Sequence, residues 1–129
     1  MTKNNNVTSF AKNILGTPLE NCCSDPITGF FRDGYCNTNQ QDTGRHLVCV
    51  IVTDEFLEFS YKRGNDLITP RPEYGFPGLK SGDGWCLCAD RWFEAYKENA
   101  APSVNLLATH EKALDIIPLD ALKKYAINH

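Results

Sequence analysis

The pattern of hydrophobic and polar positions is dominated by one uninterrupted apolar run, LVCVIV, from Leu47 to Val52. Most of its residues are β-branched, and such a run is typical of a strand that other elements cover on both faces. We therefore predict a central strand over 47–52, around which the rest of the fold is organised.

The residues that follow this strand predict a helix from Thr53 or Asp54 to Arg63. Either residue has the short polar side chain that is favoured at a helix N-cap, and Gly64 can adopt the left-handed conformation that ends a helix. The helix is expected to pack on the strand through a broad apolar face formed by Phe56, Leu57 and Phe59.

A second helix is expected to begin at Trp85, with Asp83 as its N-cap. Apolar residues recur from there at helical spacing. They are Trp85, Cys88, Trp92, Ala95 and Tyr96. Farther on, residues 104–108 alternate in polarity, which indicates a strand. A short helix is expected from Thr109, and Pro118 suits the first turn of a last helix that ends near Ala126.

Between the first two helices runs a connection of about 20 residues that has neither a helical nor an alternating pattern. It combines several prolines and glycines with apolar residues whose burial can offset the entropic cost of ordering the loop. These are Leu67, Ile68, Tyr74, Phe76 and Leu79. We predict an ordered loop over 65–84 that packs against the helix starting near Trp85 and shapes the functional face.

The chain divides into a mobile tail over 1–12, a single domain over 13–126 and a short tail over 127–129. Residues 13–35 carry short apolar groups broken by glycine and proline, which indicates short strands and turns. Strands and helices mix without a regular βαβ repeat, so the predicted class is α+β. We expect a small mixed sheet around the strand near 47–52, about four helices and the long ordered loop.

Charge and composition argue against two classes of partner. The 129 residues carry a formal net charge of −3, and the only adjacent lysines are Lys123 and Lys124, so we expect no nucleic-acid partner. No apolar run approaches the roughly 20 residues that span a bilayer, and Met1–Phe10 lacks the apolar centre of a signal peptide. We therefore expect no membrane partner and a cytoplasmic location.

Six cysteines are many for a chain of this length. In a reducing cytoplasm we expect free thiols, and the pairs 22/23 and 86/88 are too close in sequence to form unstrained bridges. Cys88 lies within the apolar stripe of the second helix and is interpreted as part of the core. Cys86 would fall in the first helical turn, where the helix dipole favours a thiolate, so it is the candidate reactive group.

Metal binding is the competing use of these thiols. Cys36, His46 and Cys49 are the candidate ligands, but the two close ligand pairs of a zinc finger are absent. His46 and Cys49 are three residues apart on a strand, which turns their side chains to opposite faces. We predict no metal and no cofactor, and keep a structural zinc as an alternative.

No segment contains a Gly-x-Ser-x-Gly elbow or a phosphate-binding P-loop, so no reaction is assigned. The candidate site consists of Cys86 with Trp85 as an aromatic wall, Arg32 or Arg91 as an anion partner, and Asp83 beside them. The leading hypothesis is a cytosolic small-molecule-binding or thiol-dependent protein. Its alternatives are the structural zinc domain and a non-catalytic interaction module that uses Tyr74 and Phe76 to contact a protein partner.

Several phrases along the chain resemble those of a small, mainly bacterial family that is known only as a domain of unknown function. They are Asn13–Leu19 (NILGTPL), Asp25–Phe30 (DPITGF), Gly64–Leu67 (GNDL), Phe76–Leu79 (FPGL), Trp85–Ala89 (WCLCA) and Ala108–His110 (ATH). The resemblance extends from Asn13 to Ala126 and implies one intact domain, without an activity to transfer. Members of this family tend to have a second cysteine where Tyr35 stands and a basic residue where Gly84 stands, so a thiol pair at 35 and 36 is missing here.

Overall fold

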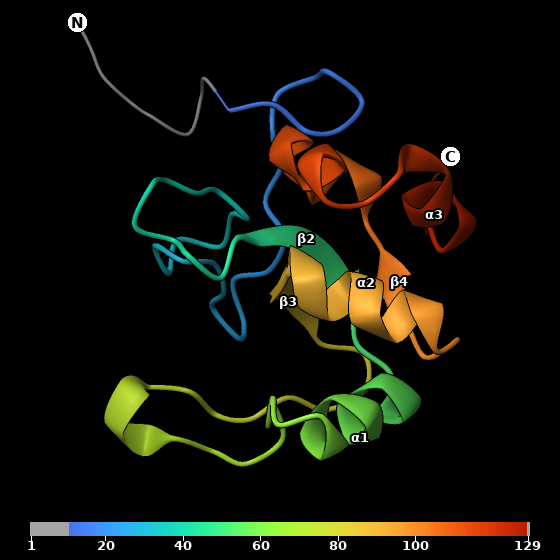
Figure 1. The fold of residues 1–129 in the computed structure, drawn as a ribbon. Helices are drawn as coiled ribbons and strands as arrows, with labels where there is room; N and C mark the ends of the chain where they lie inside the picture. The colour runs from blue at the N-terminus through green and yellow to red at the C-terminus, as the bar shows by residue number, and fades with distance from the viewer. Residues whose placement is uncertain (1–10, 129) are drawn as a thin grey trace, which may run out of the picture.

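A three-stranded antiparallel sheet is the centre of the fold (Figure 1). The computed structural model describes residues 11–128, so most of the tail expected over 1–12 lies outside the described residues. Strand β2 (His46–Ile51) lies between β3 (Gly84–Cys88) and β4 (Ser103–Val104). The predicted central strand over 47–52 is therefore confirmed, and every side chain from Leu47 to Val50 is fully buried.

Helix α1 (Asp54–Lys62) follows β2 as expected. The Thr53 hydroxyl accepts a hydrogen bond from the Phe56 N–H at 3.1 Å, which makes Thr53 the N-cap. Just past the helix, Gly64 has a φ of 88°, a conformation that residues with a Cβ rarely adopt. The capping residue and the glycine thus set both ends of α1.

The helix predicted to start at Trp85 is wrong in its first turn. Residues 84–88 form β3, and helix α2 (Ala89–Lys97) begins only afterwards. Asp83 does not cap a helix, because its carboxylate instead accepts from the Lys80 N–H and closes a turn before the strand. Trp85, Cys86 and Leu87 are all buried, so this segment is covered on both faces as β2 is.

Helix α2 covers the sheet (Figure 1). Of the five apolar residues that the helical spacing predicted, Trp92, Ala95 and Tyr96 lie on this helix, whereas Trp85 and Cys88 belong to β3. Trp92 is fully buried, and its indole N–H donates to the Pro102 carbonyl oxygen at 3.2 Å. Its ring stacks on Tyr96 and meets Tyr125 edge-on, with ring centroids 5.4 and 5.8 Å away. This aromatic group joins α2 to the C-terminal segment.

The strand predicted over 104–108 is shorter than expected. It ends at Val104, because the Asn105 side chain accepts from the Leu107 N–H and starts the 3₁₀ turn η3 (Leu106–Ala108). A second 3₁₀ segment, η4 (Glu111–Asp115), is capped by His110. The last helix, α3 (Leu119–Lys124), follows Pro118 as predicted.

Residues 13–35 form turns that isolated β-bridges hold together. The buried Asn13 side chain donates to the Thr17 hydroxyl at 2.8 Å and to the Leu107 carbonyl at 3.0 Å. This amide joins the start of the domain to η3, far away in the sequence. The fold is thus a single α+β domain, as predicted, although its named strands are all antiparallel and the described part holds three α-helices rather than about four.

The loop over 65–83 is folded and contains one 3₁₀ turn, η2 (Pro72–Tyr74). Phe76 is 8% exposed and packs on Trp85 with ring centroids 5.2 Å apart, which fastens the loop to β3. Tyr74, at the tip, is 74% exposed. The loop therefore packs against the segment at Trp85, although that segment is a strand.

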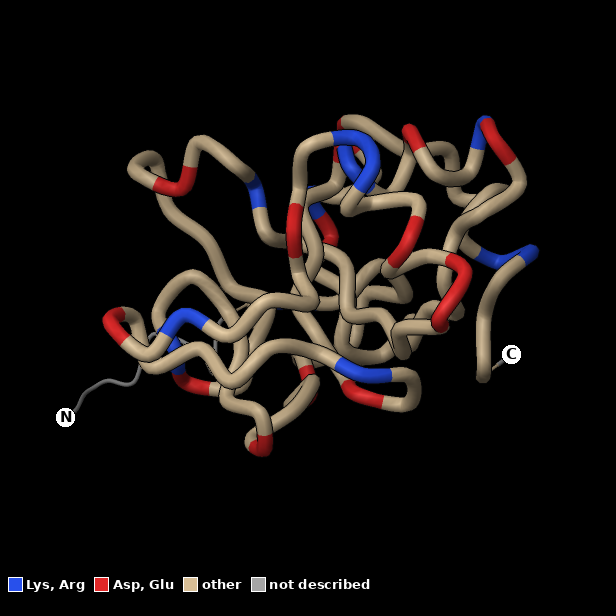
Figure 2. The backbone as a smooth tube through the Cα atoms, turned by 90° about the horizontal axis from the view of Figure 1, so that it is seen from below, with Lys and Arg blue, Asp and Glu red and all other residues tan. Residues whose placement is uncertain are grey.

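Basic and acidic residues are interspersed along the backbone (Figure 2). Exposed ion pairs join several of them, including Lys62 with Glu58 and Arg63 with Glu94. No helix in the described part is long and apolar enough to cross a bilayer. Because charges of both signs are mixed along the chain, a strongly charged site can form only where the fold brings a few like charges together.

Candidate functional site

Two cysteines face each other at the centre of the sheet. Cys49 on β2 and Cys86 on β3 are directly opposed. The Cys49 N–H donates to the Thr109 hydroxyl at 3.1 Å, and the Cys86 N–H donates to the Thr28 hydroxyl at 2.8 Å. Because neither N–H points toward the facing strand, the two residues form a non-hydrogen-bonded pair, the arrangement in which opposed side chains lie closest.

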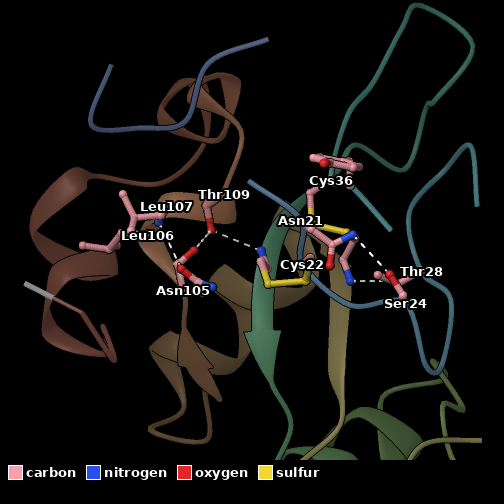
Figure 3. Close-up of a disulfide and its surroundings, with 12 residues drawn as sticks. Asn21, Cys22, Ser24, Thr28, Cys36, Asn105, Leu106, Leu107 and Thr109 are labelled. Carbon is pink, nitrogen blue, oxygen red and sulfur yellow. Dashed lines mark hydrogen bonds between the residues drawn. A yellow bond between two sulfur atoms is a disulfide. The ribbon is translucent and has the colours of Figure 1, made fainter. Parts of the chain in front are cut away.

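Each of these cysteines is bonded to a cysteine from the loops before β2 rather than to the other (Figure 3). The disulfides are Cys22–Cys49 and Cys36–Cys86, with S–S distances of 2.15 and 2.08 Å. The sulfur atoms of Cys22, Cys36 and Cys49 lie within 4.8 Å of one another. We call Cys22, Cys36, Cys49 and Cys86 the cysteine centre. The expectation of free thiols is wrong for all four of them.

Buried hydroxyl groups hold the backbone of the cysteine centre in place. Thr28 and Thr109 are fully buried, and the Thr109 hydroxyl also donates to the Asn105 carbonyl at 2.9 Å (Figure 3). Sequence reasoning missed both threonines. The only local signal was that Thr28 and Thr109 lie in the DPITGF and ATH phrases that carry the family resemblance.

Cys86 does not have the position or the free thiol that was expected of it. It lies in β3 rather than in the first turn of a helix, it is 1% exposed, and it is bonded to Cys36. A catalytic role for Cys86 would require this disulfide to open first. The free, partly exposed thiols of the described residues belong to Cys23 and Cys88.

Cys23 lies against Gly84 at the start of β3. A Cβ built on Gly84 would come 2.9 Å from the Cβ of Cys23 and 3.3 Å from the Cys22 carbonyl oxygen. A side chain at position 84 would therefore push the 22–23 segment off the strand. The small residue at 84 allows the adjacent cysteines to pack beside the cysteine centre.

The site residues predicted around Trp85 line two hollows that share Trp85 and His46. We call the two hollows together the Trp85 cleft. The first has a volume of about 140 Å³ and is lined by Gly29, Phe30, Arg32, His46, Trp85 and Cys86. The second, of about 280 Å³, is lined by Gly44, His46, Asn65, Leu67, Trp85, Leu87, Cys88 and Arg91. Arg32, Trp85 and Arg91 are thus brought to one place.

Arg32 and Arg91 differ in how far their charge is already neutralised. The Arg32 guanidinium lies 5.5 Å from the centre of a Trp85 ring, and no ion pair of Arg32 with a carboxylate is found among residues 11–128. Arg32 has a φ of 55°, an uncommon backbone conformation for a residue with a long side chain. Arg91 donates to the Arg63 carbonyl at 3.1 Å and contacts Glu94 at 3.4 Å. Arg32 is therefore the less compensated cation.

His46 and Asp42 form a hydrogen-bonded pair that sequence reasoning missed. The His46 Nδ1 atom lies 2.6 Å from Asp42 Oδ1. The Asp42 side chain is fully buried, and its Oδ2 atom accepts from the His46 N–H and from the Thr38 hydroxyl, both at 3.0 Å. Their spacing of four residues was the available signal, but a four-residue spacing predicts a contact only where the chain is helical.

Asp83 lies outside this cleft. It borders a separate hollow of about 320 Å³ with Asp25, Pro26 and Pro77. Of the three metal ligands considered, Cys36 and Cys49 belong to the cysteine centre. His46 does not, and Cys22 takes its place in the group of sulfurs.

A larger hollow, of about 530 Å³, lies between α1 and the loop. Its lining is mainly apolar, from Leu57, Tyr61, Ile68 and Leu79, with Asp54, Glu58 and Lys80 around them. It brings together no pair of reactive groups. Of the two loop aromatics suggested as partner contacts, Tyr74 is exposed and Phe76 is buried, so a protein interface here remains a prediction.

Comparison with known proteins assigns the chain to a family but gives no activity for it. Curated proteins gave no match. Residues 12–126 match a family described as uncharacterised proteins conserved in bacteria, and this range contains the cysteine centre and the Trp85 cleft. The match agrees with the resemblance found in the sequence phrases. The chain therefore belongs to DUF2237, a family of uncharacterised proteins conserved in bacteria.

Proposed function

We propose that the protein binds a small anionic molecule in the Trp85 cleft. The observation that carries this proposal is that Arg32, Arg91 and His46 border hollows that share the face of one tryptophan. The protein as a whole has a net charge of −3, so two arginines beside one tryptophan run against its average. A cationic pocket in an acidic protein favours an anionic ligand.

The cleft also has apolar walls, which suit a ligand with an aromatic or apolar body. Trp85 and Leu67 are almost completely buried, and the 37% exposed Phe30 stands at the mouth. The two hollows measure about 140 and 280 Å³, below the ~300–1,000 Å³ typical of pockets for drug-sized ligands. The ligand class that fits is a small carboxylate or phosphate with a compact apolar body.

The contribution of each arginine can be estimated. A hydrogen bond to a charged group contributes about 1.5–3 kcal/mol, which corresponds to roughly 10- to 150-fold in affinity. Arg32 is expected to contribute more than Arg91, because Glu94 already offsets part of the charge of Arg91.

Benzoate and its uncharged counterpart benzamide are suitable probes. Benzoate should bind at least tenfold more tightly than benzamide in isothermal titration, and Arg32→Gln should remove most of that difference. Arg91→Gln should remove less, and Arg71→Gln, at an exposed arginine of the loop outside the cleft, should change nothing. Equal affinities for the two probes, or equal effects of R32Q and R71Q, would contradict the proposal.

A second candidate function rests on the cysteine centre. In a reducing cytoplasm disulfides are rare. Reduction of both disulfides by a cellular dithiol would add two electrons and two protons to each and leave four thiols, three of them buried and that of Cys22 partly buried. Zinc with four sulfur ligands at about 2.3 Å needs sulfurs about 3.8 Å from one another. Three of the four sulfurs already lie within 4.8 Å of one another, so the donor set fits a structural zinc.

Elemental analysis of the protein purified under reducing conditions tests this candidate. One zinc per chain is expected for the wild type and for Cys23→Ser, whose cysteine lies outside the cysteine centre. Cys36→Ser should lose the metal, because it removes one of the four sulfur ligands. Wild-type protein that stays free of zinc after incubation with zinc and a reductant would end this candidate, while leaving the anion site untouched.

A further inference from the structure

Cys88 and His46 lie opposite one another across β2 and β3. The strand pairing shifts between His46 and Val48, so β2 contains one extra residue there. Such bulges re-aim side chains, and they are frequent beside active sites. Both residues line the same 280 Å³ hollow, together with Arg91.

The Asp42 carboxylate determines which ring nitrogen of His46 can accept a proton. An ionised carboxylate can only accept, so the 2.6 Å contact makes His46 Nδ1 the donor. In the neutral ring the lone pair is then on Nε2, the atom that can take a proton. Asp42 is held by its other oxygen through the His46 N–H and the Thr38 hydroxyl, so it is an orienting group in a fixed position.

The ring of His46 is enclosed on two sides. A Cβ on Gly44 would lie 2.7 Å from His46 Cε1, so only glycine leaves room for the ring at this place. The Phe30 ring is nearly parallel to it, with centroids 6.5 Å apart. A histidine that is positioned by a carboxylate and by packing has the features of a general base.

Cys88 is the N-cap residue of α2, and its side chain makes no capping hydrogen bond. The Ala89 N–H at the start of the helix donates to the Arg45 carbonyl oxygen at 3.0 Å. Of the two cysteines in the CLC sequence, Cys88 is the one that keeps a free thiol. Because the thiolate and not the thiol is the nucleophile, an adjacent base is needed.

We propose that Cys88 is a nucleophile, with His46 as its general base and Asp42 as the positioning residue, acting on small carbon electrophiles that carry an anionic group. The proposal rests on the proposed function, because Arg91 and the rest of the Trp85 cleft would hold that anionic group. The described residues show no direct hydrogen bond between the Cys88 and His46 side chains, and catalytic hydrogen bonds often tighten only when a ligand is bound.

In the reaction step, the Cys88 Sγ–H proton passes to His46 Nε2. A bond forms between the sulfur and the electrophilic carbon, and the bond from that carbon to the leaving group breaks. The leaving group departs with the electron pair of that bond and takes the proton from His46 if it is basic. No oxidant, reductant or metal takes part.

Iodoacetate and iodoacetamide test this step, because they differ only in charge at the group that does not react. Alkylation is followed by mass spectrometry of peptides from the native, unreduced protein, so Cys23 serves as an internal control in the same molecule. Iodoacetamide should alkylate Cys88 at least tenfold faster than Cys23. His46→Gln should remove this advantage without changing the rate at Cys23, and Asp42→Asn should reduce it in the same direction.

The charge of the reagent separates the two proposals. The ratio of the iodoacetate rate to the iodoacetamide rate should be higher at Cys88 than at Cys23, and Arg91→Gln should lower it to the value at Cys23. If H46Q slows alkylation of Cys88 but the ratio of the iodoacetate rate to the iodoacetamide rate is equal at Cys88 and Cys23, the proposal of a nucleophilic Cys88 is supported and the anion site is wrong. If benzoate binds as proposed but H46Q leaves the rate at Cys88 unchanged relative to Cys23, the nucleophile is wrong.

Discussion

At the scale of single residues, buried hydroxyl groups determine how the cysteine centre is held. Cys49 and Cys86 each have a buried N–H that has no partner in the facing strand, and Thr109 and Thr28 accept these bonds. Burying an N–H without an acceptor costs about 1–3 kcal/mol. These two threonines therefore provide the acceptors that the buried backbone beside the two disulfides needs.

Thr109→Val should lower the free energy of unfolding by about 1–3 kcal/mol, because valine keeps the shape but leaves the Cys49 N–H unpaired. Urea unfolding without reductant measures this loss. Thr109→Ser retains the hydroxyl and should lose much less. Equal stabilities for T109V and T109S would show that the hydrogen bond contributes little.

His110 introduces a pH dependence at the same scale. Burial lowers the pKa of His110 below its ordinary 6.5, with a smaller opposing effect from Glu111. Its Nδ1 atom accepts from the Lys112 N–H, a bond that requires the ring nitrogen to be unprotonated. The unfolded chain thus binds the proton more tightly, and the stability due to neutral His110 is lost as the pH falls below about 6.5.

His110→Asn should flatten this part of the stability profile, because asparagine can still cap η4 but does not titrate. Urea midpoints at pH 7.5 and pH 5 should differ more in the wild type than in H110N. Identical losses in the two proteins between these pH values would show that His110 is not responsible.

At the scale of elements, the sequence predicted β2, α1 and the last helix, because each has one strong local signal. LVCVIV is a continuous β-branched run, and Thr53 and Pro118 mark helix starts. The segment WCLC at 85–88 carried no such signal. A short apolar run without β-branched residues fits a strand or a helix equally well, and only pairing with β2 decides between them. The error in Cys86 followed directly from this ambiguity.

The loop over 65–83 was predicted from its composition, and one close approach shows how it is held. A Cβ on Gly78 would lie 2.3 Å from the Ile68 carbonyl oxygen, and Gly78 has a φ of 80°. Gly64 has a similar φ of 88° but nothing within 4 Å of such a Cβ. Comparing alanine substitutions at the two glycines therefore separates the energetic cost of the left-handed backbone conformation from that of the contact with Ile68.

Gly64→Ala should lower the free energy of unfolding by about 1–2 kcal/mol, the cost of the left-handed conformation. Gly78→Ala should cost clearly more, because the loop must also move away from Ile68. Thermal unfolding of both variants, compared with the wild type, gives the difference. A G78A protein as stable as G64A would mean that the loop is not packed as described.

At the scale of the whole molecule, the two disulfides connect the irregular N-terminal segment to the sheet. They close loops with sequence separations of 27 and 50 residues. In the chain-entropy account, loops of this size correspond to about 3.5 and 4 kcal/mol of stabilisation. Residues 13–35 have little regular structure, so much of their order depends on these bonds and on Asn13. Sequence reasoning missed these bonds because it assumed a reducing cytoplasm, and their pairing depends on contacts between segments that are distant in the sequence.

Replacing Cys36 and Cys86 together by alanine should lower the free energy of unfolding by about 2–5 kcal/mol. Urea unfolding in the absence of reductant measures the effect. Cys23→Ala, which breaks no disulfide, is the matched control and should stay close to the wild type. Equal stability of the double variant and the control would mean that the Cys36–Cys86 bond does not contribute to the fold.

The Trp85 cleft also forms only at this scale, since its arginines come from a loop and from α2. Arg32, Trp85 and Arg91 were predicted from residue type, and the structure brings all three to adjoining hollows. His46 and Asp42 could not be predicted as a pair, because their contact depends on the turn before β2. The sequence suggested Cys86 as the free thiol at the cleft, whereas Cys86 is disulfide-bonded and the free thiol that lines the cleft belongs to Cys88.

The most direct test of anion binding uses the two tryptophans of the chain. Trp85 lines the cleft, whereas Trp92 lies on α2 and is fully buried. In ¹H–¹⁵N NMR spectra assigned with Trp85→Phe, titration with benzoate should shift the indole signal of Trp85 and leave that of Trp92 in place, and Arg32→Gln should weaken the response. A Trp85 signal that does not move, or that moves no more than the Trp92 signal, would contradict the account.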